Sequence, residues 1–206
     1  MASRNNSSAR NEILEMLKED HKRAKKAFRD FEKLDVQGDP ESAQALVDQT
    51  CAELEMHTTL EEEVFYPAVR QAVKEEDLVE EAEVEHGSAK QLMAQLRELS
   101  PDNPKFAATF KVLGEYVKHH IKEEEGEMFE QLGRSKVDWE GVLEEMLERR
   151  AELEQQLGLV EEAEESEALE AEADMGEEDT DEGAKEGGVM PGGGRERGQA
   201  SKVQPR

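Results

Sequence analysis

Cysteine, proline and the larger aromatic residues are scarce in this chain of 206 residues, which holds one cysteine, six prolines, one tryptophan and two tyrosines. The lone Cys51 excludes an internal disulfide, so a reducing, cytoplasmic location is the default expectation. The chain also lacks a run of about 18 apolar residues, which excludes a membrane-spanning helix of ordinary hydropathy. Its first residues, Met-Ala-Ser-Arg-Asn-Asn-Ser-Ser, lack the apolar core of a signal peptide.

Positive charge is scarce as well. The 26 Lys and Arg residues stand against 52 Asp and Glu residues, which gives a formal net charge of −26. Such a surface repels nucleic acid and anionic membranes, so neither is expected as a partner. No segment combines a nucleophile with a base, forms a phosphate-binding loop or outlines a substrate pocket, and the sequence gives no ground for assigning an enzymatic reaction.

What the chain does contain is helical periodicity. Apolar residues recur at alternating spacings of three and four along four stretches, which is typical of amphipathic helices. Asp39 and Pro40 suit the start of the second helix, and Pro67 is expected to kink it near its end. Short connections between the stretches predict an all-α fold, an antiparallel up-down-up-down four-helix bundle. The expected helices cover about residues 11–34, 40–73, 77–99 and 104–132.

The rest of the chain divides by composition. We expect a disordered N-terminus over 1–10, the bundle over 11–133, and a helical extension over 134–160 that opens near Asp138. Residues 161–206 are acidic and rich in glycine, so they are expected to be disordered. This tail serves solubility or, alternatively, binds a protein partner that the sequence does not identify.

A His-x-x-x-Glu motif occurs twice, as His57 with Glu61 and as His120 with Glu124. Each motif follows a single histidine, His21 thirty-six residues before His57 and His86 thirty-four residues before His120. Positions i and i+4 lie on one helix face about 6 Å apart. All six residues interrupt apolar stripes, where a buried imidazole or carboxylate is costly unless it is paired or bound to a metal. The duplicated spacing therefore predicts a metal site inside the bundle.

Two alternatives compete with this interpretation. The histidines are solvated or satisfied by backbone groups if the stripe is an accident. A second register, His119 with Glu123, has the same spacing, but the apolar stripe and the repeat favour His120, and His119 then points about 100° away. Four glutamates lie off the stripe and are expected on a solvated face: Glu62, Glu63, Glu123 and Glu125.

Residues 10–133 resemble the hemerythrin-like proteins with an HHE cation-binding domain, through the paired motifs, the Phe65-Tyr66-Pro67 ending, and the upstream histidines. The resemblance implies a non-haem centre of two iron ions that binds or reacts with dioxygen or a related oxidant, with manganese the less expected metal. It implies that Glu61 and Glu124 bridge the ions. The implied terminal ligands are His21, His57, His86 and His120.

One departure from that family bears on function. Oxygen-carrying hemerythrins have a further histidine where this chain has Lys90, and the first repeat has Lys25 at the equivalent position. This favours oxygen or redox sensing, oxidant binding or iron handling over simple oxygen carriage. Tyr116 and Glu53, each one turn before a ligand histidine, are candidates to hydrogen-bond a ligand. The alternative function is a helical interaction or stress-tolerance protein whose metal site is structural or degenerate.

Overall fold

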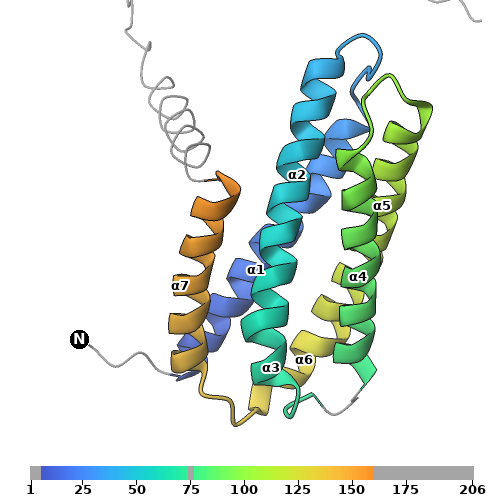
Figure 1. Ribbon diagram of the computed structural model, residues 1–206. Coiled ribbons are helices and arrows are strands. Elements are labelled where there is room, and N and C mark those ends of the chain that lie inside the picture. The colour runs from blue at the N-terminus through green and yellow to red at the C-terminus, as the bar shows by residue number, and fades with distance from the viewer. Residues whose placement is uncertain (1–5, 74–76, 160–206) are drawn as a thin grey trace, which may run out of the picture. The chain divides into compact units, whose positions relative to one another are not determined.

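The computed structural model describes residues 6–73 and 77–159, and this part of the chain contains helices and no strand. Four long helices form the bundle: α1 (Asn6–Phe31), α2 (Pro40–Leu60), α4 (Asp77–Arg97) and α5 (Pro104–Glu123). Helices α1 and α4 each pack against both α2 and α5, so the four close into a ring (Figure 1). The predicted four-helix bundle is confirmed. Every helix in the described ranges is too short or too polar to cross a membrane.

The two helices that carry the His-x-x-x-Glu motifs, α2 and α5, each widen into a π-helix at the glutamate of the motif. α2 continues into η1 (Glu61–Phe65) and α3 (Tyr66–Val69), and α5 continues into η2 (Glu124–Met128), α6 (Phe129–Gln131) and η3 (Leu132–Arg134). The wide turn adds one residue to the helical repeat, so Val69 is buried while Ala68 is only partly buried. The expected kink at Pro67 is wrong, because the irregularity begins at Glu61 and Pro67 lies in the first turn of α3, where a missing N–H costs little.

Helix starts follow local side-chain chemistry. Asp39 caps α2 by accepting a hydrogen bond from the Ser42 N–H at 3.1 Å, as expected. Helix α1 begins at Asn6, inside the segment 1–10 that was expected to be disordered. The reason is tertiary: the side chain of Asn6 accepts from the N–H of Trp139 at 2.7 Å and donates to the carbonyl of Val137 at 3.0 Å. Residues 1–5 and the predicted disordered tail from 161 lie outside the described residues.

A fifth helix, α7 (Trp139–Leu157), packs against α1 and α2 and corresponds to the predicted extension (Figure 1). Asp138 caps its start, and Gly158, with φ of 72°, ends it in the left-handed conformation that favours glycine. The buried residues Trp139, Leu143 and Met146 fix α7 to the bundle.

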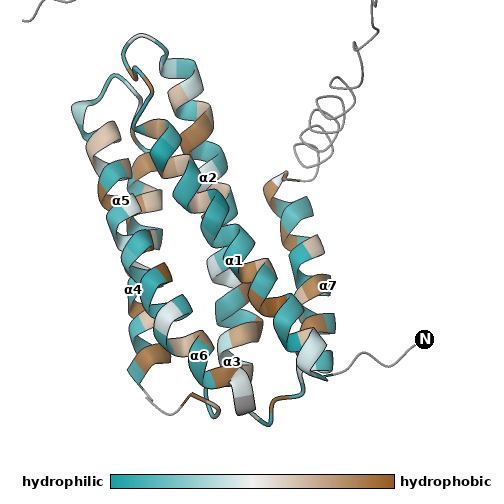
Figure 2. Ribbon diagram, turned by 180° about the vertical axis from the view of Figure 1, so that it is seen from behind, coloured by the Kyte–Doolittle hydropathy of each residue, from teal (hydrophilic) through white to brown (hydrophobic). Residues whose placement is uncertain are grey.

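Two apolar cores lie one above the other, and hydrophobic and hydrophilic residues alternate along each helix as this requires (Figure 2). One core joins the lower bundle to α7 and includes Leu17, Leu60 and Trp139. The other lies between the four bundle helices and includes Phe28 and Phe110, whose ring centroids are 5.0 Å apart. Along each bundle helix the ligand residues fall between members of the two cores, so a polar layer separates them.

Candidate metal centre

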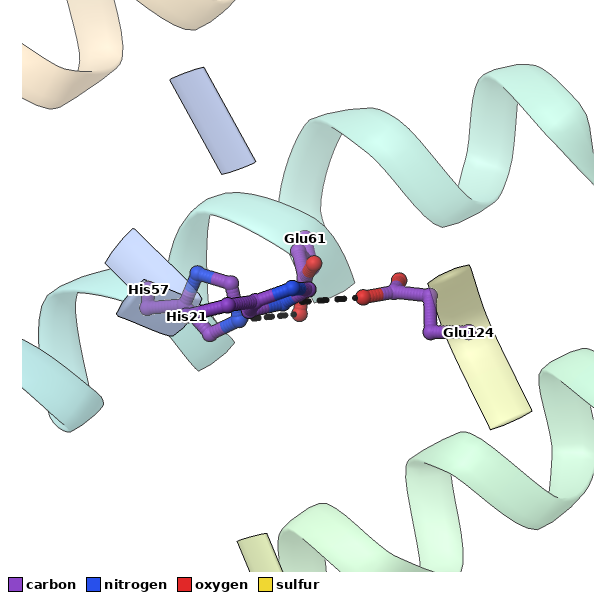
Figure 3. Close-up of side chains that lie close together, drawn as sticks. All are labelled: His21, His57, Glu61 and Glu124. Carbon is purple, nitrogen blue, oxygen red and sulfur yellow. Dashed lines mark ion pairs between the residues drawn. The ribbon is translucent and has the colours of Figure 1, made fainter. Parts of the chain in front are cut away.

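All six residues of the duplicated motif converge in the polar layer between the two cores. Each is at most 6% exposed, although all six side chains are polar or charged. Figure 3 shows four of them, with the imidazoles of His21 and His57 and the carboxylate of Glu124 directed toward Glu61. The four long helices thus bring together every ligand candidate that the sequence named: His21, His57, Glu61, His86, His120 and Glu124.

The side chains form two groups that share a carboxylate. His21, His57, Glu61 and Glu124 have ligand atoms within 4.8 Å of one another, and Glu61, His86 and His120 form the second such group. The Glu61 Oε2 atom lies 3.2 Å from His57 Nε2 and 3.4 Å from His86 Nε2. Glu124 Oε2 lies 3.1 Å from His21 Nε2 and 3.9 Å from His120 Nε2. Each glutamate therefore faces one histidine from each group, as a carboxylate that bridges two ions must.

Five of the buried atoms that face the centre lack a well-aligned hydrogen bond in the described part of the chain, although they lie close to one another. Within the described residues, no hydrogen bond reaches the Nε2 atoms of His21 and His57, the Oε1 atom of Glu61 or either carboxylate oxygen of Glu124. Buried polar atoms are almost always hydrogen-bonded or bound to a metal. Imidazole nitrogen with carboxylate oxygen suits iron, manganese or zinc. The donor set therefore fits a centre of two transition-metal ions.

Electrostatics favour a cation at the same place. Burial, together with the neighbouring Glu124 carboxylate, raises the pKa of Glu61 well above its usual range. Burial acts in the same direction on Glu124, but the close ion-pair contact with His21 and the charge of His120 outweigh it and lower the pKa of Glu124 to about 2. Two carboxylates this close in a buried layer disfavour each other's charge, and a divalent cation between them would relieve that repulsion.

Each of the four histidines has a carboxylate on the nitrogen that faces away from the centre. The four Nδ1–oxygen distances are 2.9 Å for His21 with Glu125, 3.4 Å for His57 with Asp20, 3.1 Å for His86 with Glu62, and 3.1 Å for His120 with Glu85. Such a contact fixes the tautomer and leaves Nε2 free to bind a metal.

Sequence reasoning missed these four carboxylates and placed Glu62 and Glu125 on a solvated face, which is wrong. Both are about 70% buried and contact a ligand histidine. A signal for them existed in the repeat: Asp20 and Glu85 immediately precede the first histidine of each half, and Glu62 and Glu125 immediately follow the glutamate.

A further set of side chains holds the carboxylates in place. Lys25 lies 3.3 Å from Glu125, and Lys90 lies 2.6 Å from Glu62. Lys90 is the residue expected at the position of the further histidine of the oxygen carriers, and Lys25 is its equivalent in the first repeat. Asp20 instead forms two bonds of 3.0 Å with the guanidinium of Arg150, which comes from α7. Hydrogen bonds with His57 and Arg150 outweigh the effect of burial and hold the pKa of Asp20 below its usual range.

Tyr66 is a further residue that the sequence analysis did not assign to the site. Its hydroxyl donates to Glu61 Oε2 at 3.3 Å and lies 3.4 Å from His86 Nε2. The wide turn at Glu61 allows this contact, because residues five apart then share a face. The two residues proposed from spacing, Tyr116 and Glu53, line the cavity beside the centre. Tyr116 is 47% exposed, and Glu53 accepts a hydrogen bond from Gln49, while Asp20 is the carboxylate on His57.

The register of the second motif is the predicted one. His120 is buried and faces Glu124, whereas the side chain of His119 is 60% exposed and pairs with Glu123 at 3.2 Å. The apolar stripe therefore identified the histidine that lies in the buried group.

A small cavity adjoins the centre. Its volume is about 30 Å³, and its mostly apolar wall includes Leu54, Val117 and Ile121 together with the ligands His57 and His120. This volume holds about two water-sized groups. The cavity thus leaves room for small groups beside the buried side chains.

A helical bundle that encloses paired histidine and carboxylate ligands defines a metal-site protein of the four-helix class. A family model described as the hemerythrin HHE cation binding domain matches residues 12–132. The chain belongs to this family, as the resemblance in its motifs indicated.

Two known proteins are similar to this chain, one in structure and one in sequence. The crystal structure of a hemerythrin HHE cation binding domain-containing protein from Mycobacterium kansasii is similar, with a TM-score of 0.58 and 25% identity, and the match covers 69% of this chain and 86% of that one. A protein named DNA nickase from Nostoc sp. strain PCC 7120 is 30% identical over 117 residues. That match covers 57% of this chain and 32% of the relative, so the chain spans about a third of that relative's length.

Proposed function

We propose that the protein binds two iron ions in the buried centre and interacts there with dioxygen or a related small oxidant, in sensing, binding or iron handling, in the cytoplasm. The observation that carries the proposal is the pair of ligand groups that share Glu61 and face Glu124. In this arrangement His21 and His57 would hold one ion, His86 and His120 would hold the other, and Glu61 and Glu124 would contribute ligands to both.

A pair of iron ions would supply one-electron redox chemistry and coordination positions open to a small oxidant. The chain's own residues prepare the site for this. The four Nδ1 carboxylates orient the imidazoles, and the hydroxyl of Tyr66 holds Glu61 in place. The apolar wall of the cavity, with Leu54 and Val117, excludes bulk water from the ligand side of the histidines.

Position 90 holds a lysine where oxygen carriers have a histidine, and this difference supports sensing or iron handling over reversible oxygen carriage. Lys90 contacts the carboxylate of Glu62, and Glu62 in turn contacts Nδ1 of His86, so Lys90 affects that histidine only indirectly. Each ion has two histidines within this set, which makes the two ions nearly equivalent, whereas unequal ligand numbers are expected of the oxygen carriers that the motif resembles.

The direct test is the metal content and optical spectrum of the purified protein with and without oxygen. We expect about two iron ions per chain and an absorption band that changes with oxygen. His57→Ala and Glu124→Ala lower iron occupancy, whereas His119→Ala, the matched control from the other register, leaves it unchanged. Reconstitution with ferrous iron that yields no bound iron would overturn the proposal, and bound manganese in its place would overturn the metal assignment.

The Nostoc relative's name does not change this proposal. The match reaches a third of that protein, and a net charge of −26 opposes binding to a phosphate backbone. A nicking assay on supercoiled DNA with the iron-loaded protein is expected to show no cleavage above that of iron alone.

A further inference from the structure

A third group of potential ligands lies on the surface beside the buried centre. His119 Nε2 is 3.2 Å from Glu123 Oε1 and 3.5 Å from Glu85 Oε1. The three side chains have ligand atoms within 4.8 Å of one another, and they are half-exposed or exposed. A transition metal about 2.1 Å from each donor fits between atoms at these separations.

The two repeats differ at this place. His119 and Glu123 correspond to Met56 and Leu60 of the first repeat, which are buried in the core that α7 completes. Asp20, the counterpart of Glu85, has the guanidinium of Arg150 as a permanent cation. Glu85 has instead the exposed His119 and a second carboxylate. The corresponding cation position in the second repeat is therefore open to solvent and provided with metal-binding donors.

A narrow cavity connects this surface group with the buried centre. Its volume is about 10 Å³, enough for about one water-sized group. Its polar lining consists of Glu85 and Glu123 at the exposed side and His120 and Glu124 at the buried side, and the other lining side chains are apolar. The carboxylate oxygens of Glu124 have no hydrogen-bond partner among the described residues, so a cation that passes the cavity meets an unpartnered ligand.

We propose that Glu85, His119 and Glu123 form a transit site that binds a divalent transition metal from solution and passes it to the buried centre. The inference of transit rests on the proposed metal centre, whereas binding at the surface does not. Glu85 serves both places, because its Oε1 atom faces His119 and its Oε2 atom contacts His120 Nδ1 at 3.1 Å. Metal bound outside thus lies one side chain away from a ligand of the inner site.

The test uses the full chain freed of metal, with Mn²⁺ for equilibrium titration and Fe²⁺ for loading kinetics, both without oxygen. The variants are His119→Ala and Glu123→Gln, with Glu115→Gln on the same helix as a charge-matched control whose side chain is 77% exposed. Glu85 is left intact because it also orients His120.

We expect the wild-type protein and Glu115→Gln to bind a third, weaker Mn²⁺ that His119→Ala and Glu123→Gln lose. The same two variants load iron about tenfold more slowly, the lower range of what a charged cleft adds to an association rate, and reach the same final iron content. Absence of a third ion in the wild type, or loading at the control rate in both variants, overturns the inference. A buried centre that takes no metal while the third ion binds would instead overturn the proposed function and the transit role together.

Discussion

The two repeats of the bundle supply two half-sites that agree near the metal ligands and differ farther out. His21 and His57 form one half, and His86 and His120 form the other. His21 contacts Glu125, which follows Glu124 of the second repeat, and His86 contacts Glu62, which follows Glu61 of the first. The other two histidines contact a carboxylate of their own repeat, His57 with Asp20 and His120 with Glu85. The pattern thus has two-fold symmetry through the carboxylates that orient the imidazoles.

The differences begin at the next layer. Asp20 is buried and bound by Arg150 under α7, whereas Glu85 meets His119 at the surface. Tyr66 lies at the position that Phe129 occupies in the second repeat, and each ring lies beside the first histidine of one half-site. The comparison indicates that the six buried residues and their orienting carboxylates come from a shared repeat, and that α7 and Tyr66 make the surroundings of the two half-sites differ.

The largest expected effect follows from removing a bridge. Glu61→Ala and Glu124→Ala each take a ligand from both ions, so metal content falls from about two ions toward zero in either variant, and not to one. A single-histidine variant such as His57→Ala is expected to retain about one ion, the one held by the other half. Metal analysis after reconstitution measures the difference. One retained ion in Glu124→Ala would show that this glutamate serves a single ion.

The six buried residues could be predicted because the same motif occurs twice in the sequence, with nearly constant spacing and on an apolar stripe. Glu62 and Glu125 were misplaced, because a projection with 100° per residue fails across the wide turns that begin at Glu61 and Glu124. Asp20 and Glu85 lie in the regular helices α1 and α4, and their role appears only in contacts with histidines of neighbouring helices. Arg150 was beyond reach for another reason. Periodicity indicated a helix around Trp139, but its docking against α1 and α2 depends on tertiary packing that no local pattern encodes.

The second-largest effect is expected from α7. Arg150→Met removes one of the two guanidinium groups that contact the buried Asp20, and Arg23 keeps the other. The loss is expected to destabilise the fold by about 1–2 kcal/mol, less than for a buried charge left without any partner. It also frees Asp20 from its position on His57, so the ion held by His21 and His57 weakens by about 10–100-fold. The ion of the other half keeps its affinity. Titration with Co²⁺, followed by absorbance, resolves the two equivalents.

The control for this prediction lies on the same helix. Arg149 pairs with Glu63 at 2.6 Å and Glu152 at 2.9 Å on the surface, so Arg149→Met changes stability by about 1 kcal/mol or less and leaves both affinities unchanged. Arg150→Lys retains the charge and is expected to restore part of the affinity. Equal weakening of both ions by Arg150→Met would mean that α7 acts through overall stability and not through His57.

A smaller effect is expected from exchanging the two ring positions. Tyr66→Phe removes the hydrogen bond to Glu61, worth about 1 kcal/mol or roughly fivefold in metal affinity, and makes the halves more alike. Phe129→Tyr adds a hydroxyl on the side of Glu124, whose oxygens lack a hydrogen-bond partner in the described chain. The double exchange is therefore expected to recover much of the loss. A Tyr66→Phe variant that binds metal as the wild type does would remove Tyr66 from the causes of asymmetry.

The smallest change in metal affinity is expected from Lys25 and Lys90, and its size should be similar in the two half-sites. Lys25 and Lys90 are more than a third exposed, and each contacts one orienting glutamate, so each pair contributes about 0–1 kcal/mol. Lys25→Met is expected to weaken the ion of His21, and Lys90→Met the ion of His86, each by less than tenfold. The shorter contact, 2.6 Å for Lys90 against 3.3 Å for Lys25, places the larger change in the second half. The effects should add in the double variant because the lysines share no partner. A double variant that loses far more than the sum would show that the two halves are coupled through Glu61 and Glu124, and the same Co²⁺ titration would detect it.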